Sequence, residues 1–194
     1  MNFYIDDKGF LQVWNQPDQY VEHLKCFHSV CSPDFTIASG MPTALNIYNL
    51  YRNHALGFYF AILGVNIIPS VNVISPKEMP WIFDGTPRRS TVSCCTNGRV
   101  RSKSARMEFC ENFKEMLDAI EPTKVVIVGI VPDELNVDVP IISLNSRSQN
   151  MKEMFGKEGP WEQSVADQQN EETKKPVGRR NAEADFSVLW DEET

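Results

Sequence analysis

One short run of residues limits the fold of this chain more than any other feature. Lys124-Val-Val-Ile-Val128 places four consecutive β-branched apolar residues after a lysine, and Gly129 follows them. A strand that is apolar at every position is buried on both faces, which is typical of a parallel sheet covered by helices. The run therefore predicts a strand inside an α/β fold.

The rest of the first 150 residues alternates between strand and helix patterns. β-favouring runs predict strands at 2–5, 29–32, 65–68 with a continuation at 70–73, 90–95 and 139–144. Apolar residues at helical spacing predict helices over 10–14, 20–27, 42–63 and 109–120. This order favours an α/β fold with a mostly parallel sheet flanked by helices, built as a three-layer sandwich or a partial barrel. An eight-stranded barrel would need about 250 residues.

The composition changes near residue 150. We expect an α/β domain over 1–150 and a mostly disordered acidic tail over 151–194. The tail has six Lys or Arg against 11 Asp or Glu, and only six of its 44 residues are Leu, Ile, Val or Phe. Such a composition buries too little apolar surface to offset chain entropy. Its apolar end, with Phe186, Leu189 and Trp190, either folds back on the domain or docks on a host protein as a short peptide.

Composition also bears on location and on metal sites. No apolar run reaches the roughly 18 residues that a membrane span needs, and Met1–Lys8 lacks the pattern of a signal peptide. We therefore expect a cytoplasmic protein of a bacterial host cell, without membrane association. The five cysteines are then reduced and mostly buried, which is favoured over a zinc site. No metal site is predicted, and the sequence identifies no cofactor.

Polar residues follow the predicted strands. Because the carboxyl ends of parallel strands meet at one edge, these residues should converge there. They are Asp6 and Asp7, Asp34, Asn72, and Thr96 with Asn97. We take Asp34 as the candidate catalytic residue, a general base, and the others as ligand-binding residues. The alternative is that these side chains are helix caps and turn formers.

A basic segment lies beside these residues. Between Asp84 and Glu108 there are six Lys or Arg and no acidic residue. Arg99 and Arg101 follow a Thr-Asn-Gly turn and precede a helix, an arrangement that suits a phosphate group although it is not a P-loop. The alternatives are a solvated loop and pairing with the acidic tail. Arg52, on the longest predicted helix, is a further candidate ligand-binding residue and is expected to pair with a strand-end acid such as Asp34.

Several strings resemble the domain-of-unknown-function family numbered 4417, which is common in phages, plasmids and the bacteria that carry them. They are Tyr4-Ile-Asp-Asp7, Val13-Trp-Asn15, Cys31-Ser-Pro-Asp-Phe35, Met41-Pro-Thr-Ala-Leu45, Tyr51-Arg-Asn53, Gly64-Val-Asn-Ile-Ile-Pro69 and Phe83-Asp-Gly-Thr-Pro87. The resemblance covers about residues 3–135. It implies a single α/β module with a phage or mobile-element accessory role, and it implies no particular reaction. The chain departs from the family at Val92-Ser-Cys-Cys-Thr96, where a Val-Ala-Val-Ser-Thr pattern is usual.

Two functional hypotheses follow. In the first, the domain binds a phosphorylated small molecule, a nucleotide or a nucleic-acid end at the strand edge. In the second, the protein is an inhibitor or adaptor of a host defence or replication protein and uses its acidic surface and tail. A net charge of -7 argues against nonspecific DNA binding. No Ser-His-Asp or Cys-His arrangement can be assembled from the spacing, so no enzyme class is assigned.

Overall fold

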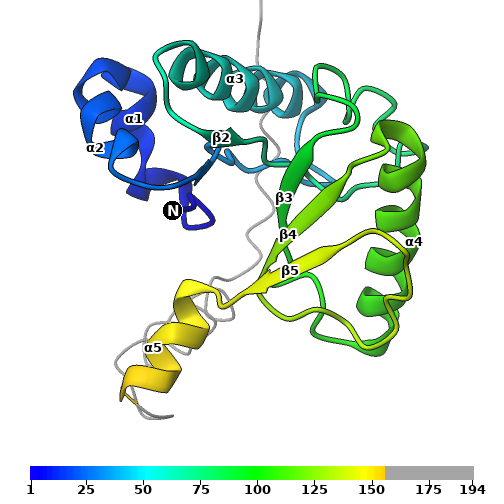
Figure 1. The fold of residues 1–194 in the computed structure, drawn as a ribbon. Helices are drawn as coiled ribbons and strands as arrows, with labels where there is room; N and C mark the ends of the chain where they lie inside the picture. Colours follow the sequence, from blue (N-terminus) through cyan, green and yellow to red (C-terminus); the bar gives the residue numbers. More distant parts are fainter. Residues whose placement is uncertain (156–194) are drawn as a thin grey trace, which may run out of the picture. The chain divides into compact units, whose positions relative to one another are not determined.

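A computed structural model describes residues 1–155 and shows helices alternating with parallel strands (Figure 1). The elements are η1 (Asp7–Gly9), α1 (Leu11–Asn15), η2 (Pro17–Tyr20), α2 (Val21–Lys25), β1 (Val30–Cys31), α3 (Thr43–Ile62), β2 (Ile67–Ile68), β3 (Thr91–Cys95), α4 (Lys103–Ile120), β4 (Lys124–Val128), β5 (Ile141–Leu144) and α5 (Arg147–Phe155). The predicted α/β class is confirmed. The tail segment with Phe186, Leu189 and Trp190 lies outside the described residues.

The strands pair in the order in which they occur in the chain. β1 pairs with β2, and β3 pairs with β4 and β4 with β5, all in parallel. A parallel bridge between Ser70 and Ser93 joins the two sheets, and the Val71 N–H donates to the Ser93 carbonyl at 2.7 Å. The connections between neighbouring parallel strands are right-handed crossovers. When the strands of a sheet follow one another in chain order, the helices in these connections therefore all lie on the same face of the sheet. This order corresponds to the partial-barrel alternative.

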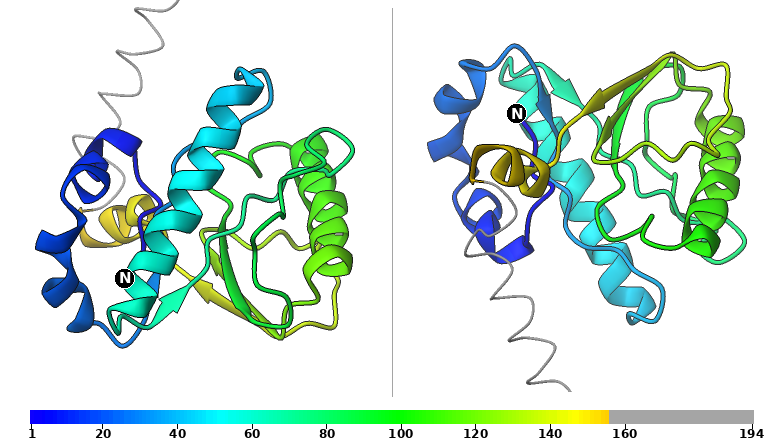
Figure 2. Two further views of the ribbon diagram at one scale, coloured as in Figure 1. Left: turned by 90° about the horizontal axis from the view of Figure 1, so that it is seen from above. Right: turned by 90° about the horizontal axis from the view of Figure 1, so that it is seen from below.

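Packing on the two faces agrees with a curved sheet. Figure 2 shows α4 along one face of the strands β3 to β5. On this face, Val92, Val125 and Ile127 pack with Phe109 and Phe113 of α4. On the opposite face, a buried cluster contains Tyr4, Cys31 of β1 and Val128 of β4. Neighbouring strands lie about 4.8 Å apart, so in a flat sheet β1 and β4 would be about 14 Å apart. Their presence in one cluster, together with Tyr4, fits a curved sheet.

Local signals set the ends of the two long helices. α3 begins after Pro42, whose ring suits a helix start, and Gly64 follows its end with φ of 89°. Ser102 caps α4 by accepting a hydrogen bond from the Ala105 N–H at 3.1 Å. Glu121 ends α4 in the left-handed region with φ of 46°. The sequence therefore predicts both ends of α3 and the C-terminal end of α4 well, whereas α4 begins at Lys103, six residues before the helix predicted over 109–120.

Two predicted strands are shorter or less regular than expected. Residues 2–5 form no assigned strand, although the Met1 carbonyl accepts the Cys31 N–H at 2.9 Å. The strand expected over 65–68 and 70–73 is reduced to Ile67–Ile68. Pro69 interrupts it because proline has no N–H to donate to a neighbouring strand. Its carbonyl still accepts the Ser93 N–H, so the chain continues beside β3.

Candidate pocket at the strand ends

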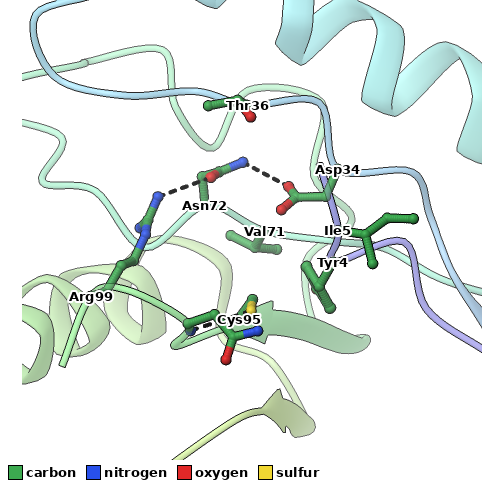
Figure 3. A pocket seen from close by; sticks show the side chains of 9 residues that line it. Tyr4, Ile5, Asp34, Thr36, Val71, Asn72, Cys95 and Arg99 are labelled. Carbon is green, nitrogen blue, oxygen red and sulfur yellow. Dashed lines mark hydrogen bonds between the residues drawn. The ribbon is translucent and has the colours of Figure 1, made fainter. Parts of the chain in front are cut away.

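The carboxyl ends of β1, β2 and β3 place three polar side chains around one cavity. Asp34 follows β1, Asn72 follows β2 and Arg99 follows β3. The cavity has a volume of about 340 Å³ (Figure 3). Its lining residues are Tyr4, Ile5, Asp34, Thr36, Val71, Asn72, Cys95, Asn97 and Arg99. The structure thus brings together the predicted residues Asp34, Asn72, Asn97 and Arg99.

Asn72 links the arginine to the carboxylate. Its Nδ2 donates to Asp34 Oδ1 at 3.0 Å, and its Oδ1 accepts from Arg99 Nη2 at 3.2 Å, as the dashed lines in Figure 3 show. Arg99 Nη1 also donates to the Val73 carbonyl at 3.1 Å. These bonds hold the guanidinium and the carboxyl group on either side of one amide, so the cavity offers a cation and an acid to the same ligand.

The carboxyl group of Asp34 has an unusual affinity for protons. Loss of solvation in the pocket raises its pKa from 3.8 to about 6, and nearby Asp7 adds to the rise. The positive charge of Arg99 and the hydrogen bond from Asn72 act in the opposite direction. A carboxyl group with a pKa near 6 exchanges its proton close to neutral pH, as a general acid or base must.

This pKa predicts how stability depends on pH. Between about pH 4 and 6 the folded chain keeps the Asp34 proton that the unfolded chain has lost, so stability falls as the pH rises and levels off above 6. Asp34→Asn should remove this slope and stabilise the protein at pH 7 by at most about 3 kcal/mol, less where solvent screens the charge. Urea unfolding from pH 4 to 7 measures the effect.

The exposed Asp133 supplies a matched control for this experiment. Asp133→Asn makes the same chemical change away from the pocket and reports the general effect of removing one negative charge. If the stability of Asp34→Asn still falls as the pH rises from 4 to 6, the assignment of this pH dependence to Asp34 is contradicted.

Asp6 and Asp7 have local structural roles. Asp6 caps η1 by accepting the Lys8 N–H at 2.9 Å. Asp7 accepts both the N–H and the hydroxyl of Thr36, the latter at 2.9 Å. Asp7 therefore fixes Thr36, which lines the cavity, whereas neither aspartate lines it. The cap interpretation describes Asp6 well.

Arg52 lies away from Asp34, and the pairing expected between them is not formed. Its guanidinium carbon lies 3.6 Å from the centre of the Phe35 ring, and Nη2 donates to Asn49 Oδ1. Stacking on an aromatic face partly replaces the water that a charged group loses. Arg52 thus supports the segment after Asp34 and does not reach the cavity.

Arg101 and Thr96 also lie outside the lining of the cavity. Arg101 is exposed on the loop before α4. Thr96 is 1% exposed, and its Oγ1 has no hydrogen-bond partner within residues 1–155. Its N–H donates to the Val128 carbonyl at 3.1 Å, so Thr96 extends the β3–β4 pairing to the edge of the pocket.

A row of asparagines on α3 holds the segment that follows Asp34. Asn46 both donates a hydrogen bond to the backbone of Ala38 and accepts one from it. Asn53 does the same with the backbone of Phe35. Asn49 donates to the Thr36 carbonyl. The spacing of three and four residues places these side chains on one face of the helix. This spacing was a readable signal for a buried polar face, which sequence reasoning missed.

Asn53 should be costly to replace. The Phe35 N–H donates to Asn53 Oδ1 at 2.6 Å, and Asn53 Nδ2 donates to the Phe35 carbonyl at 3.2 Å, both in the interior. Asn53→Ala leaves two buried backbone groups unpaired, so we expect a loss of about 2–4 kcal/mol in urea unfolding.

Asn66 provides the matched control, because it also binds backbone but is exposed. Water can replace its contacts, and Asn66→Ala should cost less than about 1 kcal/mol. Equal losses in the two variants would show that burial of the Phe35 groups is not what makes Asn53 important.

Five lining residues, Tyr4, Ile5, Thr36, Val71 and Cys95, were not among the predicted site residues. The Tyr4 hydroxyl donates to Ser93 Oγ at 2.9 Å, and burial raises its pKa well above the usual value, so the phenol stays neutral. Burial likewise raises the pKa of the Cys95 thiol. Tyr4 belongs to the Tyr4-Ile-Asp-Asp7 string, which was the available signal for it.

Within residues 1–155, no group of three or more His, Cys, Asp or Glu side chains is arranged to hold a metal ion. In the same range, no helix has both the length and the apolar character needed to cross a bilayer.

Comparisons with known proteins connect the chain to phage proteins. The family described as "Domain of unknown function (DUF4417)" matches residues 1–145. The Gene 1 protein of Mycobacterium phage L5 is 28% identical over 140 residues, which cover 72% of this chain and 61% of the phage protein. The Gene 1 protein of Mycobacterium phage D29 is 28% identical over 129 residues, covering 66% and 48%. The chain thus matches about half to three-fifths of the length of these relatives. No solved structure matches it.

Proposed function

The chain belongs to the DUF4417 family, and for this member we propose that the strand-end pocket binds a phosphorylated small molecule. The observation on which the proposal depends is that Asp34, Asn72 and Arg99 line one cavity and are joined by hydrogen bonds. The phosphate group would bind to Arg99, and a hydroxyl or amino group of the same ligand would donate to Asp34.

The size of the cavity supports a small ligand. A volume of about 340 Å³ is at the lower end of the range for small-molecule sites, which is roughly 300–1,000 Å³. The cavity also lies where parallel α/β sheets usually bind ligands, beyond the carboxyl ends of the strands. A mononucleotide or a sugar phosphate suits this volume better than a nucleic-acid strand.

The arrangement of charges supports the orientation of the ligand. Arginine binds phosphate oxygens with two parallel N–H donors, and such charge-assisted bonds are about twice as strong as neutral ones. A phosphate beside Arg99 would be repelled by an ionised Asp34, so the two groups must contact different parts of the ligand. Asn72 stands between them and keeps those parts separate.

The pocket also suits a proton transfer. The pKa of Asp34, raised to about 6 by desolvation, matches what a general base needs near neutral pH. If the bound ligand reacts, Asp34 is the group that would accept the proton.

Native mass spectrometry of the protein as purified from cells tests the proposal first. We expect an added mass that matches a phosphorylated compound. Titration with inorganic phosphate, ribose 5-phosphate and the common nucleoside monophosphates should then give saturable binding to at least one of them. A clean apo mass together with no binding of any probe at millimolar concentration would contradict the proposal.

A further inference from the structure

A second cavity shares no lining residue with the Asp34 pocket. Its volume is about 290 Å³. One wall comes from α3, another from Ile67 and Pro69 at β2, and the third from the turn around Gly85 and Pro87. Because no lining residue is common to the two cavities, they can be tested separately.

One nitrogen of His54, which lines this cavity, lacks a partner. Nε2 is buried and forms no hydrogen bond within residues 1–155. The Asp84 backbone favours protonation of the ring, but burial has the larger, opposite effect and lowers the pKa of His54, so the ring is neutral. In the tautomer that carries the proton on Nδ1, Nε2 is a buried hydrogen-bond acceptor without a donor.

The remaining polar side chains of the cavity are already satisfied. Ser32 Oγ accepts the Ser70 N–H at 2.8 Å. The Asn53 side chain both accepts a hydrogen bond from the Phe35 N–H and donates one to the Phe35 carbonyl. Among the residues that the structure describes, no Lys, Arg, Asp or Glu lines the cavity. Of the lining side chains in this part of the chain, His54 therefore has the one buried polar atom without a partner, and nothing there neutralises a charged ligand.

The walls of the cavity are apolar, and a glycine keeps it open. Phe58 is 69% exposed at its rim, which is unusual for a phenylalanine. A Cβ on Gly57 would lie 3.2 Å from Ser32 Cβ, and a Cβ on Gly85 would lie 3.5 Å from the His54 ring. Gly85 also has φ of 77°, which side chains rarely adopt. Glycine at position 85 therefore keeps the space beside His54 clear, and glycine at position 57 allows α3 to lie close to Ser32.

We propose that this cavity is a second binding site, for a flat, uncharged heteroaromatic small molecule whose ring N–H donates to His54 Nε2. The ring of the ligand packs against Phe58 and the prolines, since aromatic rings gain most from contact with other flat apolar groups. This site is independent of the proposed phosphate pocket.

Indole is the probe for this site, because its single N–H is a donor and it carries no charge. In NMR titrations we expect saturable shifts of the Gly57 and Gly85 amides. 1-Methylindole has the same ring without the donor and should bind at least 10-fold more weakly, because the buried Nε2 would stay unpaired. Equal affinities, or shifts that do not include these two amides, would overturn the proposal.

Two variants locate the site and its hydrogen bond. His54→Phe keeps a ring but removes the acceptor, so it should bind indole and 1-methylindole equally. Ala61 is exposed at the cavity rim, and Ala61→Leu should weaken indole binding at least 10-fold by filling the entrance. Ala44→Leu makes the same change at an exposed position elsewhere on α3 and should leave binding unchanged. Unchanged binding by Ala61→Leu, or continued preference for indole in His54→Phe, would overturn the assignment.

Discussion

Arg99→Gln should weaken binding of phosphorylated ligands by about 100-fold. Arg99 is the arginine that lines the cavity, and its guanidinium donates hydrogen bonds to Asn72 Oδ1 and to the Val73 carbonyl. Losing two charge-assisted hydrogen bonds to a phosphate costs about 3 kcal/mol, which corresponds to that factor. Calorimetric titration with inorganic phosphate and the tightest-binding nucleoside monophosphate measures the loss.

The effect must be separated from that of general charge and from misfolding. Arg101→Gln removes the same charge from an exposed position near Arg99, and we expect no more than a threefold loss because solvent screens it. Arg99→Lys keeps the charge without the paired donors and should lose about 10-fold. Thermal unfolding of each variant checks the fold. Equal losses in Arg99→Gln and Arg101→Gln would show that surface charge, and not the pocket, attracts the ligand.

Gly129→Ala should be the most destabilising small substitution at the edge of the sheet. Gly129 follows β4 with φ of 118°, and a Cβ there would overlap Thr96 Oγ1 and approach Asn97 Oδ1 to 3.2 Å. Thr96 is buried and cannot move aside. Backbone strain and steric overlap together should cost at least about 3 kcal/mol in urea unfolding.

Two further variants separate these causes. Gly40 has φ of 83°, but a Cβ at this position would meet open space, so Gly40→Ala reports backbone strain alone, about 1 kcal/mol. In the double variant Gly129→Ala with Thr96→Ala the overlap with the hydroxyl is relieved, and part of the stability should return. If Gly129→Ala lowers the free energy of unfolding by no more than Gly40→Ala does, steric overlap with Thr96 does not explain why glycine is needed at position 129.

The pattern of apolar and turn-forming residues alone was sufficient to predict those elements whose limits and burial follow from their own sequence. The apolar run of β4 predicted a strand, and Pro42 and Gly64 predicted the limits of α3. Strand-end position alone also predicted that Asp34 and Asn72 lie at one edge, because the ends of parallel strands meet there. The basic segment after the Thr-Asn-Gly turn predicted Arg99 beside them. The predicted tail over 151–194 extends beyond the described residues.

Pattern could not decide which of these residues share a cavity. Arg52 was expected beside Asp34, but α3 places its guanidinium over the Phe35 ring. Tyr4 was taken for part of a strand, but it packs with Cys31 and Val128 and lines the pocket. Both outcomes depend on how helices and strands pack against one another. Neither the spacing of residues within one element nor their type predicts this packing.

The sequence by itself therefore determined the class of fold, the limits of α3 and the buried strand β4. The two elements follow from the pattern of burial along a single segment, and the class follows from the alternation of such segments. Only the tertiary structure decided the packing of Tyr4 with Cys31 and Val128 and the bonded set of Asp34, Asn72 and Arg99. These depend on contacts between residues far apart in the chain, and their geometry is set by the packing of all the elements together.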